Sequence, residues 1–154
     1  MTSNFFPIFW NSTRHRQPKL CYYNLFKAEI ETEYYITANM KKGVRATYAQ
    51  FRAGILPLAI ETGRFQNVDL NDRLCLLCND MGQGNIEDEF HFLCECKKYD
   101  NERSTLYRKV SQKYPSFLEM DDIDKFIFLN MNAQTQTASF INKAFEIRRN
   151  FLYR

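Results

Sequence analysis

The residues best suited to chemistry lie in the middle of the chain. Cys75 and Cys78 are followed after twelve residues by His91 and after four more by Cys96, giving the pattern C-x2-C-x12-H-x4-C. Such a CCHC-like set of three thiolates and one imidazole is typical of one structural zinc ion. Because four protein ligands are available, no coordination position is left for a reacting water. The pattern therefore predicts a closed zinc site, one ion per chain.

A further cysteine beside the histidine leaves the fourth ligand open. Cys94 lies three residues after His91 and would share its face on an unbroken helix, whereas Cys96 lies five residues after it and would not. Cys96 can reach the metal only if the helix breaks or tightens there. Helix geometry alone does not choose between the two sulfurs.

Other uses of the cysteines fit the sequence less well. A redox-active C-x-x-C pair is expected in a βαβ context, and the sequence shows none. A disulfide framework is disfavoured because the cysteine count of five is odd and no secretory signal is evident. We therefore expect a reducing compartment, nuclear or cytoplasmic.

Composition limits the class of protein. The 154 residues are 45% apolar and 16% aromatic, enough to bury a core. No apolar run approaches the roughly 18–20 residues of a membrane span, so no membrane partner is expected. The formal net charge is only +3 and no arginine-rich block occurs, so any polyanion must be bound by local basic patches.

Helical periodicity dominates the rest of the chain and predicts a mostly all-α fold with the zinc loop at its centre. We expect a loose leader over 1–18 and a single helical domain over 19–154, with the zinc module at 73–96. The expected helices cover 19–29, 33–39 and 41–55, then a run after Cys96 that stops at Pro115. Two more follow, capped by Asp121 or Asp122 and by Thr135 or Thr137.

The helix over 41–55 has two distinct faces. Its apolar positions recur at i, i+4, i+7 and i+11, and they are Val44, Tyr48, Phe51 and Ile55. Basic residues share another face, and they are Lys41, Arg45 and Arg52. Such a stripe is either a solvated face or a line of phosphate contacts.

The remaining charges have simple expected roles. Glu87, Asp88 and Glu89 are consecutive, so they point in different directions and are expected to supply favourable charge in a first helical turn. Arg148 and Arg149 lie near the end of the last helix, where positive charge favours the helix dipole without any partner.

Catalytic motifs are missing from this sequence. It contains no P-loop, no G-x-G-x-x-G, no G-x-S-x-G and no H-E-x-x-H. Only His15 and His91 are present, and His91 is assigned to the metal, so histidine-based acid–base catalysis is nearly excluded. We expect no enzymatic activity.

Several segments together resemble one family. They are Ala49-Gln-Phe-Arg52, Gly54-Ile-Leu-Pro-Leu58, Ile60-Glu-Thr-Gly-Arg64, Arg73-x-Cys-x-x-Cys78 and Ile86-Glu-Asp-Glu-x-His-Phe-Leu93. These segments are similar to the C-terminal zinc-binding region of non-LTR (LINE-type) retrotransposon reverse transcriptase proteins. The resemblance covers roughly residues 19–154.

The resemblance implies a ligand set and a function. It selects Cys96 over Cys94 as the fourth ligand, and it implies a nucleic-acid-binding accessory role in recognising template RNA or target DNA. The basic residues expected to contact nucleic acid are Lys41, Lys42, Arg45, Arg52 and Arg64. No polymerase segment and no Tyr-x-Asp-Asp is present. The alternative is a structural protein–protein interaction module that packs on a reverse transcriptase body or a host partner.

Overall fold

The computed structural model describes residues 20, 22–27, 29–79 and 84–153. Within these ranges the fold is mostly helical, as predicted, and contains no strand. A single antiparallel bridge joins Leu74 to Ile86 at the base of the cysteine loop. The predicted leader over 1–18 lies outside the described residues.

The first helices are shorter than predicted. They are α2 (Tyr23–Phe26), α3 (Tyr34–Thr37) and α4 (Lys42–Arg52). Gly54, with φ of 65°, ends α4 in a Schellman motif: its N–H donates to the Phe51 carbonyl, and the Ile55 N–H donates to the Gln50 carbonyl. Ile55 therefore lies outside α4 and is 44% exposed, and its predicted place on the buried face is wrong.

Helix α5 (Ala59–Phe65) precedes the cysteine loop and contains a glycine, Gly63, in its interior. Gly63 is buried inside this helix, because the aliphatic part of Arg73 packs against it. A Cβ at this position would come within 2.6 Å of Arg73 Cγ. The glycine is therefore a point of close packing rather than a hinge.

The C-terminal half contains the longer predicted helices. They are α6 (Asp100–Lys113), α7 (Asp122–Asn132) and α8 (Gln134–Leu152). Asp121 caps α7 as predicted, accepting from the Asp124 N–H at 2.9 Å. The predicted threonine cap of α8 is wrong, because Ala133 precedes this helix and supplies no side-chain cap. Thr137 lies buried within the helix and donates to the Leu129 carbonyl.

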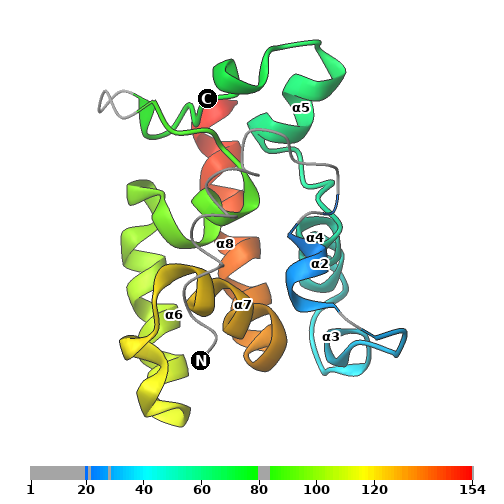
Figure 1. Ribbon diagram of the computed structural model, residues 1–154, viewed down its shortest axis with the longest axis vertical. Helices are drawn as coiled ribbons and strands as arrows, with labels where there is room; N and C mark the ends of the chain where they lie inside the picture. The colour runs from blue at the N-terminus through cyan, green and yellow to red at the C-terminus, as the bar shows by residue number, and fades with distance from the viewer. Residues whose placement is uncertain (1–19, 21, 28, 80–83, 154) are drawn as a thin grey trace, which may run out of the picture.

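Helix α8 is the element around which the others pack. It lies against α4 on one side and α6 and α7 on the other (Figure 1). Its buried face includes Phe140, Ile141 and Ala144, as the periodicity predicted. The rings of Phe92 and Tyr99, 4.9 Å apart, extend this core toward the cysteine loop.

Two arginines that were expected at the surface are part of the interior. Arg52 is 3% exposed: it forms an ion pair with Glu33, donates to the Asn130 carbonyl at 2.5 Å and lies 4.4 Å from the centroid of the Phe26 ring. Arg148 is 6% exposed and binds both carboxylate oxygens of Glu87, each at 2.7 Å. A helix-dipole role for Arg148 is therefore the wrong explanation.

The pair between Glu87 and Arg148 ties the cysteine loop to α8, and its loss should be costly. Arg148→Met is expected to lower the free energy of unfolding by about 3–5 kcal/mol, because it leaves a buried carboxylate without its cation. Chemical denaturation of the full chain measures the change. Arg149→Met, one residue along on the exposed side, is the matched control and should stay within about 0.5 kcal/mol of the parent. Equal losses in the two variants would contradict the role given to the pair.

Candidate metal centre

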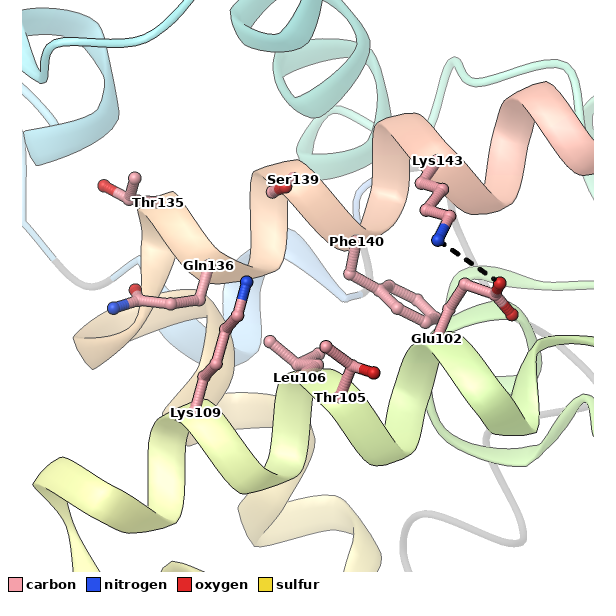
Figure 2. A pocket seen from close by; sticks show the side chains of 9 residues that line it. All are labelled: Glu102, Thr105, Leu106, Lys109, Thr135, Gln136, Ser139, Phe140 and Lys143. Carbon is pink, nitrogen blue, oxygen red and sulfur yellow. Dashed lines mark ion pairs between the residues drawn. The ribbon is translucent and has the colours of Figure 1, made fainter.

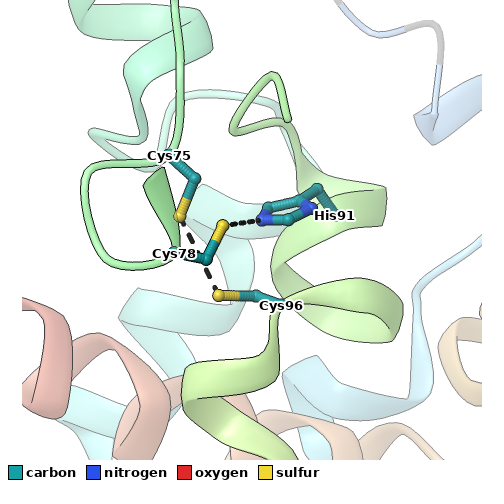
Figure 3. A group of neighbouring side chains, drawn as sticks. All are labelled: Cys75, Cys78, His91 and Cys96. Atoms are coloured by element: carbon teal, nitrogen blue, oxygen red, sulfur yellow. Dashed lines mark hydrogen bonds between the residues drawn. The ribbon is translucent and has the colours of Figure 1, made fainter. Parts of the chain in front are cut away.

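Four side chains converge in one buried cluster. Cys75, Cys78, His91 and Cys96 each offer one ligand atom, and these atoms all lie within 4.8 Å of one another (Figure 3). All four residues are at most 1% exposed. Three sulfurs and an imidazole nitrogen facing one point are compatible with binding of a single metal ion.

The first two cysteines are placed by a small antiparallel loop. The Cys75 N–H donates to the Asn85 carbonyl at 2.8 Å, and the Glu87 N–H donates to the Arg73 carbonyl at 3.0 Å. The Asn79 N–H then donates back to the Cys75 carbonyl at 3.0 Å, closing the turn that carries Cys78. These bonds hold the C-x-x-C segment in one conformation.

A π-helical turn decides which cysteine completes the cluster. Residues His91–Glu95 form the turn η4, in which the Cys96 N–H donates to the His91 carbonyl five residues earlier, at 2.8 Å. The helix is therefore wider at this turn, whereas a break or a tightening was expected. The wider turn places Cys96, at position i+5, beside His91. Cys96 joins the cluster, while Cys94 lies outside it and burial raises the pKa of its thiol.

The imidazole of His91 is oriented by a carboxylate. Its Nε2 faces Cys78 Sγ at 3.4 Å, and its Nδ1 faces Glu95 Oε2 at 3.2 Å. This is the arrangement that fixes a metal-binding histidine in one tautomer, with Nδ1–H directed to an acceptor and Nε2 free to coordinate. Sequence reasoning did not assign Glu95, although its i+4 spacing from His91 is a usable signal.

The thiols and the imidazole of the cluster shift one another's pKa values. The Cys96 thiol, 3.8 Å from Cys75 Sγ, lowers the pKa of Cys75 to about 3, against the effect of burial. Burial lowers the pKa of His91, but the Cys75 sulfur and the Glu95 carboxylate together raise it to about 9. Burial raises the pKa of Cys78 to about 11. A metal cation binding here must displace the remaining thiol and imidazole protons.

The three acidic residues before His91 are buried. They were expected only to supply favourable charge in a first helical turn, which does not require burial. Glu87, Asp88 and Glu89 are at most 5% exposed. Asp88 does support the start of the turn, accepting from the His91 N–H at 2.7 Å, and it also accepts from the Tyr22 hydroxyl at 2.5 Å. Burial, with the neighbouring Asp88 carboxylate, raises the pKa of Glu89 to about 8.

Arg103 secures the other end of the π-helical turn. It is 7% exposed, and it donates to the Leu93 carbonyl at 2.9 Å and to the Cys96 carbonyl at 2.6 Å. The Cys96 carbonyl also accepts from the Tyr99 N–H at 3.2 Å, so the guanidinium adds a second donor where the turn ends. Nothing local in the sequence distinguishes Arg103 from an exposed arginine of α6.

The five basic residues proposed for nucleic acid do not form one surface. Lys41 and Lys42 are exposed at the start of α4. Arg45 is half-buried and donates to the carbonyls of the α3–α4 connection, including Ala38 at 2.8 Å. Arg64 forms an ion pair with Glu61 at 3.0 Å, and Arg52 is enclosed in the core. Of the predicted stripe of Lys41, Arg45 and Arg52, only Lys41 is exposed, and Lys42 lies beside it.

Comparison with protein-family models, curated proteins and solved structures finds no match for this chain. None of the described helices is both long enough and apolar enough to span a membrane. The cluster at Cys75, Cys78, His91 and Cys96 is thus the feature with the most definite chemistry. All four atoms of the cluster come from protein, which suits a structural metal rather than one that binds substrate.

Metal content distinguishes the two candidate cysteines. Cys94→Ser should retain about one metal ion per chain, because Cys94 lies outside the cluster, whereas Cys96→Ser should lose tight binding of the ion. Elemental analysis of the two purified variants beside the parent measures this. Retention of the ion by Cys96→Ser would contradict the ligand set.

Acidification should release the metal. Thiolates and a neutral imidazole bind metal, so affinity is high at neutral pH and falls as protons compete at lower pH. The stability that the metal contributes is therefore expected above about pH 7 and should be lost progressively towards about pH 5. Melting temperatures of the parent and Cys96→Ser, recorded across this range with zinc present, test this. The two should converge on acidification, and parallel curves would count against the prediction.

Proposed function

We propose that this chain is a non-catalytic, zinc-stabilised nucleic-acid-binding accessory domain derived from a retrotransposon reverse transcriptase. In this proposal it assists recognition of template RNA or target DNA. The closed, buried cluster of four ligand atoms is the observation that supports stabilisation by zinc. The retrotransposon origin rests on the sequence segments that resemble that family.

The cluster dimensions favour zinc. A tetrahedral ion bound at about 2.3 Å to sulfur and about 2.0–2.1 Å to nitrogen separates two sulfurs by about 3.8 Å and a sulfur from a nitrogen by about 3.5 Å. Cys75 Sγ and Cys96 Sγ are 3.8 Å apart, and Cys78 Sγ and His91 Nε2 are 3.4 Å apart. Soft thiolate ligands also favour zinc over hard cations. When bound, the ion supplies positive charge that holds the buried thiolates together.

The start of α4 is the surface that fits phosphate best among the residues first proposed. Lys41 and Lys42 are both exposed there, and the first turn contains no acidic residue. Positive charge at a helix N-terminus opposes the dipole and costs about 0.3–1 kcal/mol of stability. The same arrangement concentrates positive potential, which attracts a polyanion. The two lysines are therefore better explained by a ligand than by the stability of α4.

The exposed apolar side chains favour the second candidate, an interaction module for a reverse transcriptase body or a host partner. Examples are Phe65 at 76%, Leu76 at 53% and Tyr153 at 83% exposed. Exposed apolar side chains mark a protein-binding surface where they gather into one contiguous patch. This candidate needs no polyanion, so a nucleic-acid titration separates the two.

Salt-dependent binding tests the nucleic-acid function. The full chain with zinc should bind single-stranded RNA at low salt, and affinity should fall as salt is raised. Lys41→Gln/Lys42→Gln should reduce the slope of log affinity against log salt by about 1.4, because two phosphate contacts are lost. Lys97→Gln/Lys98→Gln, an exposed lysine pair beside Cys96, is the matched control and should change the slope less. Fluorescence anisotropy at several salt concentrations measures these slopes. Absence of binding at low salt would favour the interaction module.

A further inference from the structure

A groove between α6 and α8 is separate from both the cysteine cluster and the start of α4. Its volume is about 360 Å³, within the usual range for small-molecule sites. Its floor contains the buried side chains of Leu106 and Phe140. Its walls carry polar groups from both helices, and these are Glu102, Thr105, Lys109, Thr135, Gln136, Ser139 and Lys143.

Two lysines reach into this groove from opposite walls. Lys109 extends from α6 towards α8, and Lys143 extends from α8 towards α6 (Figure 2). Lys143 is held over the groove by an ion pair with Glu102, at 3.6 Å. Lys109 makes no ion pair within the part of the chain that the structure describes. The Lys109 end of the groove therefore has an excess of positive charge.

The types of donor in the groove favour phosphate over carboxylate. The lining contains no arginine, whose planar fork matches a carboxylate. Lysine instead provides a point charge with donors in several directions, and the hydroxyls of Thr135 and Ser139 add further adaptable donors on α8. A tetrahedral phosphate, with acceptor oxygens facing several ways, can use donors from two facing helices at once. The apolar floor suits an organic substituent on that phosphate.

We propose that the α6–α8 groove binds an organic phosphate, with the phosphate group at Lys109 and with Lys143 on the opposite wall further along the groove. The phosphate belongs either to a free small molecule or to a nucleotide within a single strand. The binding chemistry is the same in both cases, and it does not depend on the lysines at the start of α4.

The test uses the zinc-loaded full chain and three phosphate probes: inorganic phosphate, adenosine monophosphate and a single-stranded oligonucleotide. Binding is followed by two-dimensional NMR of the backbone amides. Adenosine monophosphate should shift amides of α6 and the first half of α8. Lys109→Gln should weaken this binding by about tenfold or more. The matched control is Lys113→Gln, which removes the same charge one turn along α6 and outside the groove, and it should leave binding unchanged.

A substitution at Glu102 is expected to change the affinity in the opposite direction. Its carboxylate repels a bound phosphate and competes for Lys143, so Glu102→Gln should tighten binding of adenosine monophosphate. A variant that merely loosened the packing of α6 on α8 would weaken binding instead. A rise in affinity thus supports the groove as an anion site, and a fall or no change counts against it.

The probes also separate the two sources of phosphate. Lys109-dependent binding of adenosine monophosphate indicates a free organic phosphate, whereas Lys109-dependent binding of the oligonucleotide alone indicates a strand. Binding of none of the three probes, or binding that is indifferent to Lys109, overturns the inference. If oligonucleotide binding is lost only in Lys41→Gln/Lys42→Gln, the groove is not the phosphate site. The nucleic-acid-binding function proposed above is then still supported.

Discussion

The carboxylate of Glu87 is the point at which the separate parts of this fold are joined. It receives two hydrogen bonds from Arg148 in α8 and one, at 2.7 Å, from the Ala59 N–H at the start of α5. One of its oxygens lies 3.9 Å from Cys75 Sγ. Because a buried ionised group is tolerated only when its partners are correctly placed, this carboxylate allows the cysteine loop one position against α5 and α8. The geometry of the cluster therefore depends on the packing of α8, and the packing of α8 depends on the position of the cysteine loop.

The charges around this point indicate why a cation suits the cluster. Three thiolates and a neutral imidazole around a divalent ion carry one net negative charge, and Glu87 adds another. Arg148 offsets one of these two charges at close range. Without a divalent ion, three thiolates beside a buried carboxylate would repel one another strongly, so the raised pKa values of Cys78 and Cys96 favour thiols at these two positions. A bound divalent ion and Arg148 would therefore be complementary, because each would neutralise part of a negative site that neither would neutralise alone.

Local patterns in the sequence predicted much of the fold and of the cluster. The apolar spacing in α8 and the cap at Asp121 depend on neighbouring residues, and both are present in the structure. The misplaced arginines share one physical cause, which is partners distant in sequence. Arg148 binds a carboxylate 61 positions away, and Arg52 donates to a carbonyl 78 positions away. No local rule distinguishes these arginines from solvated ones. The π-helical turn that selects Cys96 is similarly set by tertiary bonds, including those from Arg103.

The different uses of arginine and lysine determine what kind of recognition the surface can perform. Several arginines donate to backbone carbonyls or carboxylates inside the fold, and they include Arg45, Arg52, Arg73, Arg103 and Arg148. Lysines at the start of α4 and in the α6–α8 groove face outward. Lysine is a hydrated point charge that contacts phosphate well, whereas the arginine fork is the usual reader of guanine edges. A nucleic acid bound by these lysines would be held through its phosphates, with little discrimination between bases. Selectivity for a particular RNA or DNA would then have to come from shape or from another protein bound alongside.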